Sequence, residues 1–149
     1  HAFNRLMSNR DGLIEDCRLA QSVLCDTTAI DVQLTELCNE IEVVTELSRK
    51  AIFENAHKAV NQTEWVERNN AYLDRHRKAS ERVDELESAK RERLGKAKII
   101  DGFIKGIESR PLAITEFDDK LWLAVVDTAT VGRDGTMTFK FKNGTEITE

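Results

Sequence analysis

Proline is nearly absent from this chain, and aromatic residues are scarce. Of 149 residues, one is proline, Pro111, and 6% are aromatic. The segment before Pro111 therefore lacks the strongest helix breaker. The 33% of charged residues leave little material for a compact core and are typical of long, solvated helices. We expect one domain, or one long element on a small base.

The sequence also lacks the signatures of membrane spans, metal sites and catalysis. No run approaches the roughly 20 apolar residues that a membrane span needs. We recognise no signal peptide, and because the chain begins with His1 rather than Met we expect a fragment of a longer protein. No phosphate-binding glycine loop, H-E-x-x-H motif or matched nucleophile is present, so we predict no enzymatic activity and no cofactor in this chain.

The net charge and the cysteine positions give no support for a nucleic-acid-binding or zinc-binding protein. The net charge of -5 gives no global argument for nucleic-acid binding. Cys17, Cys25 and Cys38 form no C-x2-C pair, so we predict no zinc site and interpret them as reduced residues packed on helices. Reduced cysteines are typical of a cytoplasmic protein.

Apolar spacing predicts three helices before Pro111. Residues 2–24 carry apolar side chains three and four positions apart, somewhat weakened by Gly12, and Asp26, Thr27 and Thr28 are N-cap candidates for a second helix. The second helix, 28–57, shows the alternating four- and three-residue spacing of a coiled coil. A third helix, 64–108, continues this pattern after a turn and cap at Asn61 and Thr63. The expected seam residues are Ile30, Leu34, Leu37, Ile41, Val44, Ser48 and Ala51 in the second helix, and Trp65, Asn69, Tyr72, His76, Ala79, Val83, Leu86, Lys90, Arg93, Ala97, Ile100, Ile104 and Ile107 in the third.

The charge distribution predicts that the second and third helices pair with each other. The segment 26–48 contains six acidic residues and no Lys or Arg, whereas 88–98 contains five basic residues and one Glu. If the chain folds back near residue 60, these segments face each other, and ion pairs of this kind select orientation and register. An antiparallel hairpin is predicted. The alternative is a three-helix bundle in which residues 2–24 pack along the pair.

The last 39 residues predict a small base. Thr115 is the expected cap of a helix over 116–127, whose apolar face includes Phe117, Leu121 and Trp122. Three short strands follow, with Asp134-Gly135 and Asn143-Gly144 in the tight turns between them. Met137, Phe139 and Phe141 alternate along the middle strand, and we expect the Trp122 helix and the apolar residues Phe3, Leu6, Phe103 and Ile104 to cover that face.

The sequence therefore predicts a mainly α fold: a long antiparallel coiled-coil hairpin projecting from a small α+β base with a C-terminal three-stranded antiparallel β-meander. We divide the chain into a base helix (1–25), a coiled-coil arm (26–110, with its tip near 57–63) and a completing segment (111–149). The terminal sheet belongs to the base of the arm.

Residues 114–147 resemble the C-terminal end of the large serine recombinases, the integrase and transposase branch of the resolvase/invertase superfamily. The resemblance rests on four features: Phe-Asp-x-x-Leu-Trp at 117–122, Val-Asp-x-x-x-Val at 126–131, the Asp134-Gly135 hairpin, and Phe-x-Phe-x-x-Gly-x-x-Ile at 139–147. The heptad segment is similar to that family's coiled-coil insertion, and 2–24 is similar to the helix after its zinc ribbon.

The resemblance implies a non-catalytic part of a site-specific DNA recombinase. The family's serine domain and zinc-binding cysteines lie upstream of the matching region, so zinc is expected only in the parent protein. The implied partners are DNA, other recombinase subunits that meet through the coiled coil during synapsis, and in some cases a directionality protein. No membrane partner is implied. The rival hypothesis is a free-standing coiled-coil scaffold or dimerisation module.

Two groups of candidate site residues follow. The arm tip offers His57, Val60, Asn61 and Gln62 for protein contact, with Val60 and His57 the most accessible. The apolar side chains near the bend, expected to form an exposed patch, are Phe53, Val60, Trp65 and Val66. The alternative is that these side chains only close the seam. Weaker candidates for DNA contact are Arg133, Lys140 and Lys142, for which the simpler interpretation is a solvated outer face.

Overall fold

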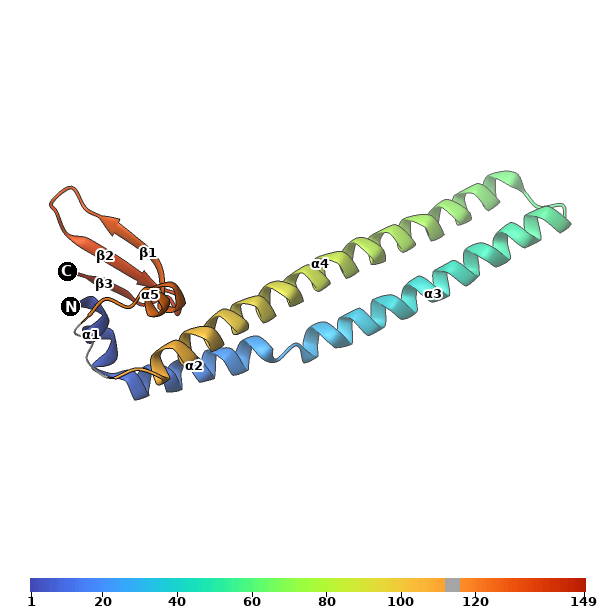
Figure 1. Cartoon of the computed structure of the whole chain (residues 1–149). Helices are drawn as coiled ribbons and strands as arrows, with labels where there is room; N and C mark the ends of the chain where they lie inside the picture. The colour runs from blue at the N-terminus through green and yellow to red at the C-terminus, as the bar shows by residue number, and fades with distance from the viewer. Residues whose placement is uncertain (112–115) are drawn as a thin grey trace. The chain divides into compact units, whose positions relative to one another are not determined.

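The computed structural model describes residues 1–111 and 116–149 (Figure 1). Within these residues the elements follow in the order α1 (Ala2–Met7), α2 (Arg10–Cys25), α3 (Thr28–His57), α4 (Gln62–Glu108), α5 (Asp119–Val125), β1 (Val126–Val131), β2 (Met137–Phe141) and β3 (Glu146–Thr148). The chain groups into two compact units: residues 27–92, here the hairpin unit, and residues 1–26 with 93–149, here the sheet unit.

The antiparallel hairpin of α3 and α4 is confirmed (Figure 1). The predicted limits of the second helix, 28–57, agree with α3, and α4 begins two residues before the predicted start at 64. Its register also agrees, because Glu40 lies 2.7 Å from Arg75 and Asp31 lies 2.5 Å from Lys90. The residue numbers in both pairs place the fold-back point near 60, as the charge pattern predicts.

The heptad spacing predicts burial correctly at all positions but one. The positions up to Lys90 form the seam between α3 and α4, whereas those from Arg93 onward belong to the sheet unit. In α3 every predicted seam residue is buried or half-buried, with Val44 at 1% exposure and Ala51 at 3%. In α4, Ala79 and Leu86 are buried. His76 is the exception and is exposed. Water satisfies the ring nitrogens of an imidazole at lower cost than an apolar seam does, so the ring turns outward.

Two long cations occupy the predicted seam of α4, and both bring their charge to an oxygen. The Lys90 ammonium reaches Asp31, and this hydrogen bond, followed by one from Thr27, lowers the pKa of the Asp31 carboxyl. The Arg93 guanidinium donates to the carbonyls of Val23 (2.7 Å) and Asp26 (3.2 Å). The break between α2 and α3 leaves carbonyls without helical partners, and Arg93 supplies a donor for them.

The single helix predicted over 2–24 is wrong, because the chain divides it into α1 and α2 at Ser8 and Asn9. The Ser8 hydroxyl donates to the Arg5 carbonyl at 2.7 Å, a side-chain bond that competes with helix continuation. Gly12, expected to weaken the helix, lies inside α2. A Cβ at position 12 would come within 2.9 Å of the Asn9 side chain. The glycine therefore leaves space for the side chain of Asn9, which precedes the first residue of α2.

The arrangement of α2 also decides against a three-helix bundle along the whole pair. Arg18 of α2 lies 2.5 Å from Glu108, in the last turn of α4. Arg93, which bonds the end of α2, belongs to the same part of α4. Thus α2 packs against the part of α4 beyond residue 92, whereas α3 packs against the part before it.

The helix predicted over 116–127 begins later and ends earlier than expected. The cap expected at Thr115 lies outside the described residues. The Asp118 side chain accepts from the Leu121 backbone N–H at 3.0 Å and caps α5, which ends at Val125. Phe117 consequently lies before the helix and is 73% exposed rather than part of its apolar face.

The three-stranded antiparallel meander is confirmed, in the order β1-β2-β3 (Figure 1). Phe141 pairs with Val126 and Phe139 with Ala129, and the register shifts between Val126 and Thr128. The two predicted turns contain Gly135 at φ 84° and Gly144 at φ 92°. Both values lie in the left-handed region, where glycine carries no Cβ penalty.

The core of the sheet unit joins segments from both ends of the chain. Its fully buried side chains include Met7, Phe103, Ile107, Val125 and Phe141. As predicted, Leu6, Phe103 and Ile104 pack in this core, and Phe3 packs partly buried against it. The Cys17 thiol is also in this core, and burial raises its pKa.

The cap of α5 predicts a dependence of stability on pH. The hydrogen bond from Leu121, aided by the charge of Arg110 at 3.0 Å, lowers the pKa of Asp118. The stabilisation is therefore present above the ordinary Asp pKa and is lost as pH falls through the lower, folded-state value. We expect the melting temperature of wild type to exceed that of Asp118→Asn at pH 7, and the difference to shrink as pH falls below the ordinary Asp pKa. Asp119→Asn removes the same charge without touching the cap and is the control. A difference that stays constant down to about pH 2 would contradict the assignment.

Candidate functional site

The turn between α3 and α4 is held by its own polar side chains. The Asn61 side-chain oxygen accepts from the backbone N–H of Thr63 at 3.0 Å and of Glu64 at 3.4 Å, so Asn61 is the cap and Thr63 lies inside the helix. Gln62 donates to the Asn55 side chain at 2.8 Å and ties α4 back to α3. Two of the predicted contact residues, Asn61 and Gln62, therefore have structural roles in the turn.

The other two predicted tip residues differ in exposure. His57 is exposed, and its ring stacks on Phe53 with the ring centroids 4.2 Å apart. Phe53 is itself 62% exposed, so the end of α3 presents an aromatic pair. Val60 is half-buried and offers less surface than expected. Trp65 is half-buried and donates to the Ala51 carbonyl at 3.0 Å, which confirms that it packs within the hairpin.

One side of the hairpin seam is charged. Glu54 lies 3.8 Å from Arg68, and Glu40 lies 2.7 Å from Arg75. On each helix these residues recur at multiples of seven, the spacing of positions that flank a coiled-coil seam. Their ion pairs join α3 to α4 along this edge.

The opposite side of the seam is uncharged near the tip. Thr45 and Ile52 of α3, and Val66 and Leu73 of α4, are each separated by seven residues. Ile52 is 54% exposed, Leu73 is 55% exposed and Val66 is 44% exposed. Large aliphatic side chains exposed next to one another on two helices form a patch suited to packing against a partner. We call these four residues the apolar edge.

A shallow pocket runs into the apolar edge and connects it to the seam. It is lined by Val44, Thr45, Ser48, Arg49, Ile52, Tyr72, Leu73 and His76. Within it, Ser48 donates to the Asn69 side chain at 3.2 Å across the seam. At this position along the seam, polar side chains stand where apolar ones would otherwise pack, and the His76 side chain is exposed. The pocket exists because the seam is not closed by large aliphatic side chains here.

Sequence reasoning named one residue of the apolar edge, Val66, and missed the other three, although the signal was present. Ile52 and Leu73 each lie one position after a seam residue, Ala51 and Tyr72. The heptad assignment alone would have placed them on the flank of the hairpin. The contrast with the ion pairs of the other flank would then have identified an uncharged side.

The residues proposed for DNA contact are already partly engaged. The Lys140 ammonium lies 3.8 Å from the Glu146 carboxylate on the neighbouring strand. The Lys142 ammonium donates to the Leu123 backbone carbonyl. Arg133 is exposed in the turn between β1 and β2, beside Asp134. The geometry therefore leaves Arg133 as the most accessible of the three cations.

Other kinds of site were sought in the part of the chain that the structure describes. Among residues 1–111 and 116–149, no three side chains of His, Cys, Asp or Glu gather as metal ligands. Over the same residues, none of the helices combines the length and apolar character required to cross a membrane. Comparison of the chain with protein-family models, with curated proteins and with solved structures gives no match.

Proposed function

We propose that this chain is a non-catalytic, C-terminal part of a large serine recombinase, in which the helical hairpin makes subunit-subunit contacts during synapsis and the sheet unit contributes to DNA binding. The chain supplies no catalytic residue in this proposal. The serine nucleophile and the zinc site belong to the upstream part of the parent protein.

The positions of the residues that carry the family resemblance support this proposal. Asp118 caps α5, Leu121 and Phe141 are buried, and Gly135 and Gly144 hold the left-handed turns. Each has a structural role within one unit, which is what a motif that specifies a folded domain requires. A hairpin that served only as a scaffold would need none of them, and this weighs against the rival hypothesis.

The apolar edge is the observation that carries the role in subunit contact. Its aliphatic side chains are about half exposed, while the other flank of the seam is closed by ion pairs. Burial of apolar surface at a contact stabilises association by about 25 cal/mol per Å². A second subunit that packs on this edge would remove it from water, and the shallow pocket between Ile52 and Leu73 would receive one of its side chains.

Self-association of the chain tests this role. We expect weak, concentration-dependent dimerisation in sedimentation equilibrium, and the double variant I52E/L73E is expected to weaken it about 100-fold or more, because it places charges in an apolar contact. The matched control is V32E/V43E, which introduces the same charges at Val32 and Val43, each 52% exposed. Equal loss in both variants would show a general charge effect and contradict a contact at the apolar edge.

The parent protein provides the test that separates the proposal from its rival. The coding sequence on the 5′ side is expected to encode, in frame, a serine-nucleophile domain and paired cysteines. In that parent, I52E/L73E is expected to impair synapsis while leaving binding to a single attachment site unchanged. A start codon immediately before His1 would support the free-standing scaffold instead.

A further inference from the structure

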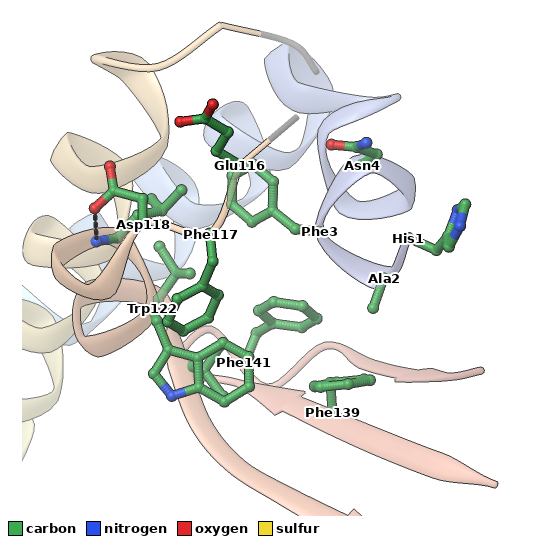
Figure 2. A pocket seen from close by; sticks show the side chains of 13 residues that line it. His1, Ala2, Phe3, Asn4, Glu116, Phe117, Asp118, Trp122, Phe139 and Phe141 are labelled. Carbon is green, nitrogen blue, oxygen red and sulfur yellow. Dashed lines mark hydrogen bonds between the residues drawn. The ribbon is translucent and has the colours of Figure 1, made fainter. Parts of the chain in front are cut away.

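A second pocket lies within the sheet unit, beside the capped helix α5. It has a volume of about 320 Å³ and is bordered by α1, the segment before α5, α5 itself and β2 (Figure 2). Ligand pockets typically measure about 300–1,000 Å³, so this one is at the small end and is suited to one side chain or a similar group.

Aromatic rings form the walls of this pocket. Trp122 and Phe139 stand nearly perpendicular, with an interplanar angle of 89° and centroids 6.0 Å apart. Phe117 lies 5.7 Å from Trp122 and is tilted by 51°. Figure 2 shows these rings, with that of Phe3, around the pocket. Two perpendicular rings form adjacent walls of the pocket, and the π-face of each ring carries negative electrostatic potential.

The pocket carries groups of both signs, because His1 with its N-terminal ammonium lines it as well as two carboxylates. Asp118 and Glu116 both line it. The Asp118 oxygens are occupied, one by the Leu121 N–H and the other by Arg110. The Glu116 side chain is exposed, in the segment that leads into α5 (Figure 2). An incoming cation would therefore meet the aromatic faces, and the Glu116 carboxylate lies at the rim of the pocket, away from Trp122 and Phe139 (Figure 2).

We infer that this pocket binds the cationic side chain of an arginine or lysine on a partner polypeptide. A cation held over the face of a tryptophan or phenylalanine is the interaction that aromatic cages provide. Phe117, 73% exposed beside the pocket, adds apolar surface for the chain that carries the cation. Its exposure is costly for the isolated chain, and a polypeptide partner would cover it.

The test titrates the full chain with N-acetyl-arginine amide and follows the indole N–H signal of Trp122 by NMR. The chain has two tryptophans, and the variant W65F assigns the two signals. N-acetyl-citrulline amide is the matched neutral control, because it has nearly the shape of arginine without the charge. At low ionic strength we expect arginine to shift the Trp122 signal and citrulline to bind at least about tenfold more weakly.

Two substitutions separate recognition from folding. E116Q removes the exposed carboxylate and is expected to weaken arginine binding about threefold to tenfold while leaving the melting temperature unchanged. W122L is expected to abolish binding, and because it removes the indole probe, binding is followed through the backbone amide signal of Phe139. The amide signals of Gly135 and Gly144 report whether the sheet unit still folds. K120Q changes an exposed charge of α5 outside the pocket and is expected to have no effect.

Three outcomes would overturn the inference. Equal binding of arginine and citrulline would show a purely apolar site. The absence of any Trp122 shift with both arginine and N-acetyl-lysine amide would show that the pocket does not bind these side chains. Binding of tetramethylammonium without binding of arginine or lysine would assign the pocket to a free quaternary ammonium ion rather than to a polypeptide.

Discussion

Replacing Phe141 by alanine is expected to lower the free energy of unfolding of the sheet unit by about 3–5 kcal/mol, the usual cost of removing a buried aromatic ring. Phe141 is 2% exposed in the central strand β2 and packs in the core that joins residues near both ends of the chain. The loss combines the transfer free energy of the removed ring atoms with the cost of the cavity left behind. Because the sheet has only three strands in the described residues, few neighbouring side chains can move in to fill that cavity.

The measurement is urea unfolding of F141A, followed through the Trp122 indole signal so that only the sheet unit is observed. A local probe is needed because a chain with two compact units need not unfold in one step. The matched control is F117A, which removes the same ring from a position 73% exposed. Only its contact with Trp122 is lost, and we expect a cost below about 1 kcal/mol. Similar losses in the two variants would contradict the assigned core.

The parts of the fold that were predicted correctly are those encoded in short-range patterns. The four- and three-residue spacing of Leu34, Leu37 and Ile41 specifies a coiled-coil seam without reference to the rest of the chain. The acidic and basic segments then fix the pairing, and Asp31 does meet Lys90. The glycine turns were equally local, because a positive φ at Gly135 and Gly144 depends on the dipeptides themselves.

The errors arose where tertiary packing chooses between local alternatives. Ser8 and Asn9 both favour helix caps, yet the apolar spacing continues on either side of them and predicts a single helix. The break separates Leu6 and Met7 from Ile14 and Cys17, and all four side chains are buried in one core. Thr115 and Asp118 are both good caps, and the sequence does not choose between them. Asp118 is stabilised there by Arg110, a contact that only the folded sheet unit provides.

The contact role of the tip stays a prediction, but two of its residues have roles other than those expected. Asn61 and Gln62 were named for protein contact, yet their polar groups hold the turn. The apolar edge lies on the flank of the seam, where exposure depends on how closely the two helices approach. At His76 and Ser48 the seam is polar, and Ile52 and Leu73 remain about half exposed beside it.

Replacing Val44 by aspartate is expected to unfold the hairpin unit while leaving the sheet unit folded. Val44 is 1% exposed in the seam of α3. A carboxylate at this position would be buried without a partner, and the expected cost is at least about 3 kcal/mol. We expect a large loss of helical circular dichroism and movement of the Trp65 indole signal to its random-coil position. The Trp122 signal is expected to stay in place, because its contacts with Phe117 and Phe139 lie within the sheet unit.

The adjacent residue supplies a matched control for this variant. Val43 is also a valine of α3 but is 52% exposed, so V43D introduces the same charge into solvent and should change stability by no more than about 0.5 kcal/mol. Comparable unfolding in V43D would show that the helix tolerates no added charge, whatever its position, and would remove the support for the assigned seam. Loss of the Trp122 signal together with that of Trp65 in V44D would show that the two units fold as one. The sheet unit would then depend on the hairpin for its stability, and disruption of the hairpin in the parent protein would disturb DNA binding as well as synapsis.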